Sequence, residues 1–157
     1  MRTYAPRAQT PLLRVFQTRD HLSAMSGITP QGALYTLVRE QALSGNESVL
    51  FLKHLHHQIG AKRLLIWDGS PIHRCNEVKT FLAEGGAPHI HLEPLPPYAP
   101  DLNADEGVWQ HLKHVELRNL CCANLSDLHH ELQLAIRRLR HIPELIQSFF
   151  AGAGLSL

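Results

Sequence analysis

The chain has 157 residues, of which 44% are hydrophobic and 18% charged, and its net charge near pH 7 is +1. This length suits one domain with its own core, and the composition excludes a chain that is disordered over most of its length. The near-neutral charge excludes a globally basic nucleic-acid binder, so any surface for nucleic acid has to be local.

The cysteine count and the hydropathy pattern bound the cellular compartment. Cys75 and the adjacent Cys121 and Cys122 form neither a disulfide framework nor two CxxC knuckles, which favours a reducing compartment. No segment approaches the roughly 18 apolar residues of a membrane span, and the start has no apolar signal-peptide core. We expect a soluble, cytoplasmic protein with no membrane partner.

The first 60 residues predict strands followed by a helix. The run LLRVF at 12–16 is a short strand candidate in an arginine- and proline-rich start. Two β-compatible runs at 21–28 and 33–40 flank a TPQG turn, which predicts an antiparallel hairpin. Apolar residues then recur at helical spacing over 46–59, which predicts an amphipathic helix capped by Asn46.

The middle of the chain predicts a strand, a helix and a second strand. The apolar run LLIW at 64–67 stops at a DGSP turn, as in a parallel strand that is buried on both faces. A helix is expected over 74–84, followed by two glycines that suit a helix end. Alternation over 89–95 predicts another strand.

The rest of the chain is predicted to be helical. A helix begins near Asn103, and two more fit residues 125–140 and 142–150, whereas the tail at 151–157 is expected to fray. The order hairpin, helix, strand, helix, strand and helices predicts an α/β fold, a mixed sheet covered by helices.

Carboxylates follow the LLIW strand and precede the next helix. Asp68 stands at a strand end, where polar sites of α/β sheets gather, although Asp before Gly is also a common turn residue. Asp101, Asp105 and Glu106 lie in the stretch LPPYAPDLNADEGVW at 95–109. Asn103 and Glu106 also have the spacing of a capping box, so a purely structural role remains an alternative for these carboxylates.

Two stretches, WDGSPIHR at 67–74 and LPPYAPDLNADEGVW at 95–109, resemble the DDE endonuclease domain of insertion-sequence transposases related to mariner elements. That family carries its second catalytic Asp in a D-x-[AS]-P-I-H motif at a strand end. Its last acidic residue closes the motif P-x-[SA]-P-[DE]-L-N-P-x-E. Asp68 matches the first motif and Glu106 the second, with 37 residues between them.

The resemblance implies a fold, a reaction and a site. The fold is a ribonuclease H-like mixed sheet with flanking helices, and the reaction is DNA cleavage and strand transfer in transposition. Asp68 and Glu106 are the implied catalytic ligands of Mg²⁺ or Mn²⁺, and carboxylate oxygens are the ligands that such hard ions prefer. His73 and Arg74, beside Asp68, are candidates for contact with a DNA phosphate, although Arg74 fits a plain surface position equally well.

The resemblance also implies partners and domain limits. The partners are transposon-end and target DNA, with a homodimer or a full-length transposase as possible protein partners and a nucleoid-associated location when DNA is bound. The limits are a partial catalytic domain over 1–120, a C-terminal helical extension over 121–150 and a flexible tail over 151–157.

One part of the family pattern has no counterpart in this sequence. The family's first catalytic Asp lies on a central first strand, upstream of a segment that matches RTYAPRAQTP, which here begins at residue 2. Asp20 follows that segment and is not a substitute. We therefore expect an N-terminally truncated domain that lacks the central strand, and an incomplete triad that is inactive alone.

Two alternatives come from other residues. A non-catalytic DNA- or transposase-binding remnant would use a basic helix over 132–140, although a solvated face fits that helix better. Zinc or copper binding by paired histidines is the second alternative, against which a solvated surface is favoured. The pairs are His54 with His56 and His57, His89 with His91, and His111 with His114.

Overall fold

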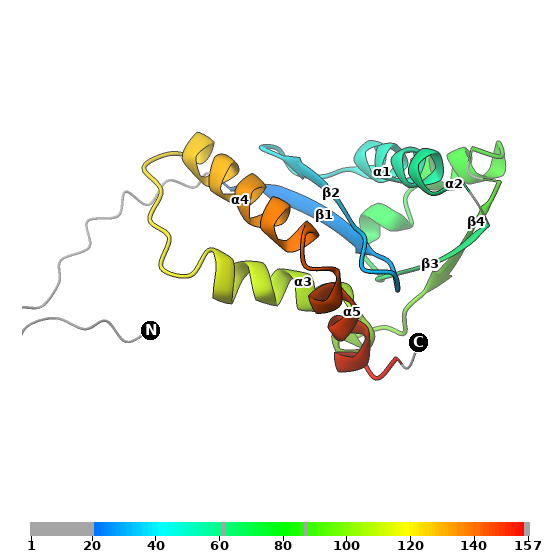
Figure 1. Cartoon of the computed structure of the whole chain (residues 1–157). Coiled ribbons are helices and arrows are strands. Elements are labelled where there is room, and N and C mark those ends of the chain that lie inside the picture. Colours follow the sequence, from blue (N-terminus) through cyan, green and yellow to red (C-terminus); the bar gives the residue numbers. More distant parts are fainter. Residues whose placement is uncertain (1–20, 61, 87, 156–157) are drawn as a thin grey trace, which may run out of the picture.

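The computed structural model describes residues 21–60, 62–86 and 88–155, which fold into two small sheets with helices around them (Figure 1). Strands β1 (Ser23–Ile28) and β2 (Leu34–Arg39) pair antiparallel, and β3 (Arg63–Trp67) and β4 (Ile90–Pro94) pair parallel. The predicted mixed α/β architecture is thus confirmed at this level. The strand predicted at 12–16 lies outside the described residues.

The predicted hairpin is confirmed in its register and in its turn. Ile28 pairs with Leu34 at the closed end, and the Gly32 N–H donates to the Thr29 carbonyl oxygen at 2.9 Å. Gly32 has φ +84°, a conformation that glycine adopts without steric cost, and Pro143 packs against its Cα. The hairpin turn therefore also anchors the start of the last helix.

Helix α1 (Gly45–Ile59) begins with a capping box that the sequence prediction placed incorrectly. The cap is Ser44, whose backbone N–H donates to the Glu47 carboxylate at 2.9 Å and whose hydroxyl accepts from the Asn46 N–H. Asn46, predicted as the cap, is instead the second residue of the helix. The S-x-x-E spacing was the decisive signal.

The expectation that LLIW is buried on both faces is wrong, whereas its parallel pairing is confirmed. Leu65 packs beneath α1, but Leu64 and Ile66 on the opposite face of β3 are 61% and 48% exposed. Among the described residues β3 has one strand neighbour, β4, and its opposite face remains largely open to solvent. The apolar run therefore predicts a strand correctly, but it does not predict how much of the strand other elements of the fold bury.

Seven further helical segments follow, and α2, α3, α4 and α5 keep the predicted order. A 3₁₀ turn (Pro71–His73) leads into α2 (Asn76–Ala83), and a second (Pro100–Leu102) leads into α3 (Asp105–His111). A π-helical turn, Leu112–Glu116, extends α3. The last helices are α4 (Leu125–Arg140) and α5 (Pro143–Gly152). The first residues of the predicted flexible tail thus belong to α5, and Ala153 is buried.

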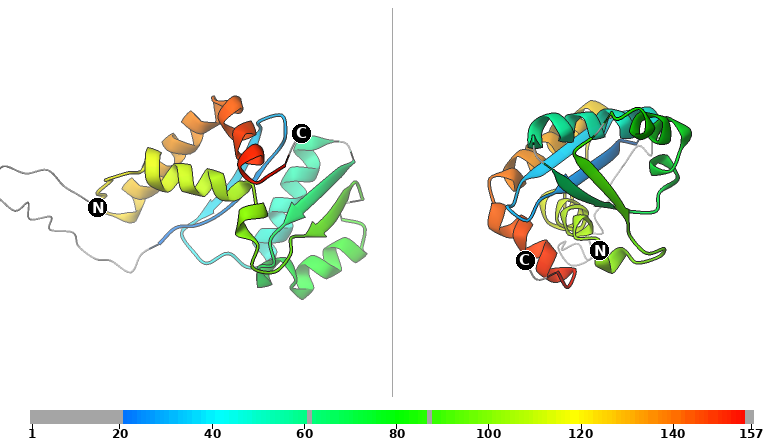
Figure 2. Two further views of the ribbon diagram at one scale, coloured as in Figure 1. Left: turned by 90° about the horizontal axis from the view of Figure 1, so that it is seen from below. Right: turned by 90° about the vertical axis from the view of Figure 1, so that its right-hand side faces the viewer.

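The core consists of two clusters on opposite faces of the β1–β2 hairpin. On one face, Leu34 and Val38 pack with the fully buried Val108, Ile136 and Ile146 from α3, α4 and α5. On the other face α1 packs across both sheets through the residues Met25, Tyr35, Leu37, Phe51, Leu55, Leu65 and Ile90. Helix α1 is therefore the element that joins the two sheets (Figure 2). In the described part of the chain, no helix has the length and apolar character that crossing a membrane requires.

Candidate functional site

Asp68 lies directly after β3, and its turn fixes one of its two carboxylate oxygens. The DGSP sequence makes an Asx turn in which the Ser70 N–H donates to Asp68 Oδ1 at 2.9 Å. The side chain is 54% exposed. The strand end thus presents a carboxylate that is oriented by the backbone and open to solvent.

His73 faces the same carboxylate. Its ring stacks on Trp67, with 4.6 Å between the ring centroids, and Nε2 lies 3.4 Å from Asp68 Oδ1. Burial lowers the pKa of His73 below its usual 6.5, which the Asp68 carboxylate only partly opposes, so the ring is neutral at pH 7. The side chain is 12% exposed, which leaves little surface for a DNA phosphate. Arg74 is exposed and keeps that candidate role.

The first turn of α3 is anchored to β1 through Asp105. Asp105 Oδ2 accepts from the Ser26 hydroxyl at 2.5 Å and from the Trp109 indole Nε1–H at 3.2 Å. The other oxygen, Oδ1, is buried without a partner among the described residues. These bonds fix the start of the helix that carries Glu106.

The pKa of Asp105 is affected by the charges of both candidate metal ligands, Asp68 and Glu106. Burial raises the pKa of Asp105 from 3.8 to about 6, against the hydrogen bonds from Ser26 and Trp109, which lower it. The negative charges of Glu106 and Asp68 raise this pKa further. The end of β3 and the first turn of α3 therefore lie close enough for their carboxylates to interact electrostatically.

Glu106 follows Asp105 and lines a cavity of about 730 Å³ between α3 and α5. The reciprocal capping box expected from Asn103 and Glu106 does not form. Asn103 Oδ1 accepts instead from the Asp105 N–H at 3.2 Å, and its carbonyl oxygen accepts from the Glu106 N–H at 3.0 Å. The Glu106 side chain is therefore not used to cap the helix.

The proline-rich loop before α3 presents an aromatic side chain. Tyr98 is 103% exposed and has φ +58°, which is rare for a bulky residue. The flanking Pro97 and Pro100 restrict the backbone on both sides. An exposed, backbone-restricted ring of this kind is suited to stacking on a nucleobase.

The donor chemistry of Asp68 and Glu106 fits a hard divalent ion, but the two residues do not make a complete site. Both offer carboxylate oxygens, which Mg²⁺ and Mn²⁺ prefer. Among the described residues, however, no three His, Cys, Asp or Glu side chains are grouped to hold a metal ion together.

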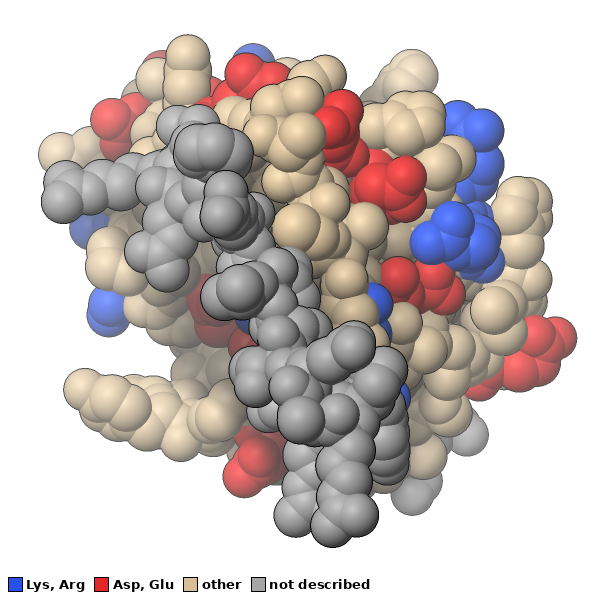
Figure 3. Space-filling model, turned by 90° about the vertical axis from the view of Figure 1, so that its left-hand side faces the viewer, with Lys and Arg blue, Asp and Glu red and all other residues tan. Residues whose placement is uncertain are grey.

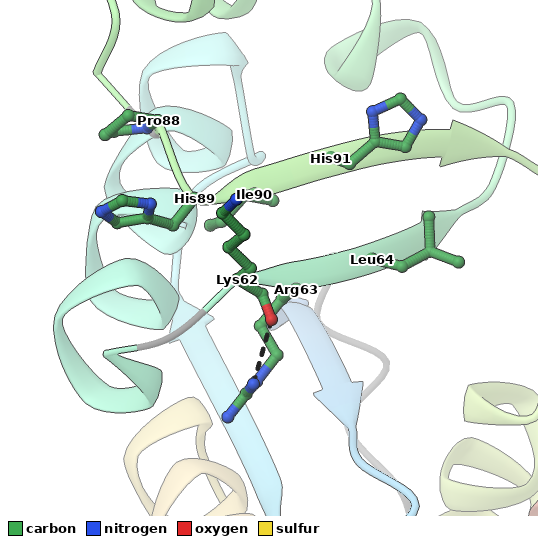
Figure 4. Close-up of a pocket in the computed structure, with 7 residues that line it drawn as sticks. All are labelled: Lys62, Arg63, Leu64, Pro88, His89, Ile90 and His91. Carbon is green, nitrogen blue, oxygen red and sulfur yellow. Dashed lines mark hydrogen bonds between the residues drawn. The ribbon is translucent and has the colours of Figure 1, made fainter.

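The histidines of the zinc or copper alternative form no group of three or more possible metal ligands among the described residues. His56 stacks on His89, with ring centroids 5.7 Å apart, and His91 lies 3.6 Å from Glu93. Figure 4 shows His89 and His91 at separate places beside a cavity of about 420 Å³ at the start of β3 and β4, and its other lining residues are Lys62, Arg63, Leu64, Pro88 and Ile90. This cavity lies at the end of β3 opposite Asp68.

The basic helix of the remnant alternative is partly used inside the fold. Arg138 Nε donates to Glu116 Oε2 at 2.6 Å, and Arg140 Nε donates to the Leu34 carbonyl oxygen at 3.0 Å. On the face drawn in Figure 3, the described Lys and Arg side chains are interspersed with Asp and Glu. Arg138 and Arg140 therefore each bond to a neighbouring segment of the fold, although both remain exposed, as does Arg137.

Comparison with known proteins resolves the family. A model of the DDE superfamily endonuclease matches residues 1–129. The chain belongs to the DDE superfamily of endonucleases. This DDE-superfamily chain is similar in fold to a chain of the crystal structure of the Mos1 strand transfer complex; the match covers 100% of this chain, with a TM-score of 0.62 and 15% sequence identity. It spans half the length of that chain, and no curated protein matches it.

Some parts of the candidate site in this DDE-superfamily domain were not foreseen from the sequence. Ser26 is 79 positions from Asp105, and no local pattern connects them. Trp67 was predicted only as part of the strand, whereas in the structure its ring stacks on the His73 ring. The DGS sequence did contain a usable signal. An Asp side chain often accepts a hydrogen bond from the backbone N–H two residues later, which is an Asx turn.

Proposed function

We propose that this chain is part of the catalytic domain of a DDE transposase, in which Asp68 and Glu106 hold divalent ions at the DNA bond that is cut and joined. The observation that carries the proposal is that Asp68 follows the end of β3 with an exposed carboxylate, and that Glu106 lies in the first turn of α3, which the Ser26–Asp105 hydrogen bond joins to β1. The fold likeness and the family match support it.

The residues of the chain have distinct parts in this proposal. When bound, a pair of divalent ions activates the attacking oxygen and stabilises the leaving oxygen of a phosphodiester. Asp68 contributes from a turn that orients its carboxylate, and Glu106 contributes from a helix start that is bonded to β1. Arg74 contacts a phosphate, and Tyr98 stacks on a base near the cut.

The proposed site is completed by a third carboxylate on a strand between β1 and β3. Two observations support room for it: each sheet has two strands among the described residues, and α1 packs across both sheets. A strand there would pair with the edges of β1 and β3 that have no partner among the described residues, and a ribonuclease H-like fold has a strand at this central place. Residues 21–155 alone are then expected to bind metal weakly and to leave DNA intact.

Two assays test the proposal. Isothermal titration with Mn²⁺ should show binding that Asp68→Asn and Glu106→Gln each weaken at least about tenfold, whereas Asp101→Asn, an exposed carboxylate of the same segment, leaves it unchanged. Unchanged binding in either ligand variant would refute the metal site. In a supercoiled-plasmid assay with Mn²⁺ the chain alone should not nick DNA. Asp68-dependent nicking by the chain alone would refute the need for a third carboxylate.

A further inference from the structure

The ring of His73 is held in one orientation beside Asp68. Its face stacks on Trp67 with 21° between the ring planes, and the side chain is 12% exposed. His73 is also the last residue of the short 3₁₀ turn, where its backbone N–H donates to the Ser70 carbonyl oxygen at 3.0 Å. Backbone and ring are therefore both constrained within five residues of Asp68.

The environment of the two ring nitrogens selects a tautomer. Nδ1 is buried without a hydrogen-bond partner among the described residues, and Nε2 lies 3.4 Å from Asp68 Oδ1. A proton on Nδ1 would bury an unpaired donor, which is costly, whereas a proton on Nε2 faces a carboxylate. The arrangement therefore favours the neutral Nε2–H form.

Ser70 and His73 both lie beside the same carboxylate oxygen of Asp68, Oδ1. The Ser70 N–H donates to Oδ1 at 2.9 Å, and His73 Nε2 lies 3.4 Å from that oxygen. No described residue forms a hydrogen bond with Oδ2. One oxygen is thus held by the protein and the other is left for a ligand.

We propose that His73 is a positioning residue for Asp68: with Ser70 it holds Oδ1, so that Oδ2 is presented to the divalent ion. The inference rests on the proposed function, because it needs Asp68 to be a metal ligand. Residues that hydrogen-bond a ligating carboxylate fix its rotamer before the ion arrives, and their loss typically weakens metal binding about 10–100-fold. Trp67 supports this role, because its ring stacks on the His73 imidazole and fixes the orientation of that ring.

Two substitutions at His73 separate donation from stacking. His73→Phe keeps an aromatic ring on Trp67 but loses the donor, and His73→Gln keeps an N–H donor but loses the ring. Isothermal titration with Mn²⁺ should show roughly 10–100-fold weaker binding for His73→Phe and a change within about threefold for His73→Gln. Lys79→Gln, at an exposed position of α2, is the matched control and should bind as the wild type does.

In EDTA, the metal-free His73 variants should have melting temperatures similar to that of the wild type. If the role of His73 were merely structural, the substitutions would lower the melting temperature. Wild-type affinity in His73→Phe would overturn the inference, and so would equal losses in His73→Phe and His73→Gln. If Asp68→Asn weakens binding while His73→Phe does not, only this inference fails. If Asp68→Asn also leaves binding unchanged, the proposed function fails.

A measurement on the unmodified chain keeps the inference testable if His73→Phe does not fold. Nitrogen-15 NMR of the histidine rings, with His73 assigned by its absence in His73→Gln, reports the protonated nitrogen directly. The inference predicts the Nε2–H tautomer at pH 7 without metal. An Nδ1–H tautomer would overturn it, because Nε2 would then have no proton to donate to Asp68.

Discussion

The two small sheets differ in how they are covered. The β1–β2 hairpin has α1 on one face and α3, α4 and α5 on the other, whereas β3–β4 has α1 on one face and leaves Leu64 and Ile66 exposed on the other. Glu106 depends on the covered sheet through Asp105 and Ser26, and Asp68 extends from the open one. The stable core and one half of the candidate site therefore lie in different environments.

This difference shows which contacts set the geometry of the candidate site. The start of α3 is bonded to β1, so Glu106 moves with the well-packed hairpin. Asp68 is fixed locally by Ser70 and His73, but its strand is joined to the hairpin mainly beneath α1.

The largest expected effect contrasts the same residue type on the two sheets. Ile136 is fully buried against the hairpin, and Ile66 is 48% exposed on β3. Ile136→Ala should lower the free energy of unfolding by about 2–5 kcal/mol, since it removes buried methyl groups and leaves a cavity. Ile66→Ala should lower it by less than about 1 kcal/mol. Urea unfolding measures both, and equal losses would show that the two sheets are equally well covered.

The second effect depends on pH and concerns Asp105 on the covered side. Its pKa is raised in the folded state from 3.8 to about 6, so the folded state binds the proton more tightly than the unfolded state does. The contribution of this group to stability is therefore greatest below pH 3.8 and is lost as the pH rises through 6. The full difference amounts to about 3 kcal/mol.

Urea unfolding of the metal-free wild type and Asp105→Asn, at a series of pH values, checks this prediction. The Asn side chain does not ionise, so the stability of the wild type relative to Asp105→Asn should decline between pH 4 and pH 8. A difference between the two proteins that is independent of pH would show that Asp105 is not buried in its ionisable form.

A smaller effect compares two glycines. A Cβ on Gly107 in α3 would lie 2.6 Å from the Phe149 side chain, whereas one on Gly69 after β3 would meet no atom within 4 Å. Gly107→Ala should destabilise the fold by about 1–3 kcal/mol through overpacking, less the gain of up to about 1 kcal/mol from helix propensity. Gly69→Ala should change stability by less than about 1 kcal/mol. Thermal unfolding measures both, and a stabilised Gly107→Ala would contradict the tight α3–α5 packing.

Local patterns predicted the elements well, because period and turn chemistry act within a few residues. The hairpin, β3, β4 and the helices all lie within a few residues of their predicted places. Burial was less predictable: the LLIW run could not reveal that Leu64 and Ile66 are exposed, since exposure depends on elements distant in sequence. The motifs singled out Asp68 and Glu106, but the Ser26–Asp105 bond and the Trp67–His73 stack depend on the assembled fold.

The central claim is that Asp68 and Glu106 serve one metal centre, and paramagnetic broadening by Mn²⁺ tests it most directly. In two-dimensional ¹⁵N NMR, substoichiometric Mn²⁺ should broaden the amide signals around Asp68 and around Glu106 together. Asp68→Asn should then reduce the broadening around Glu106, and Glu106→Gln should reduce it around Asp68. Broadening around each residue that persists when the other is substituted would contradict a shared metal centre.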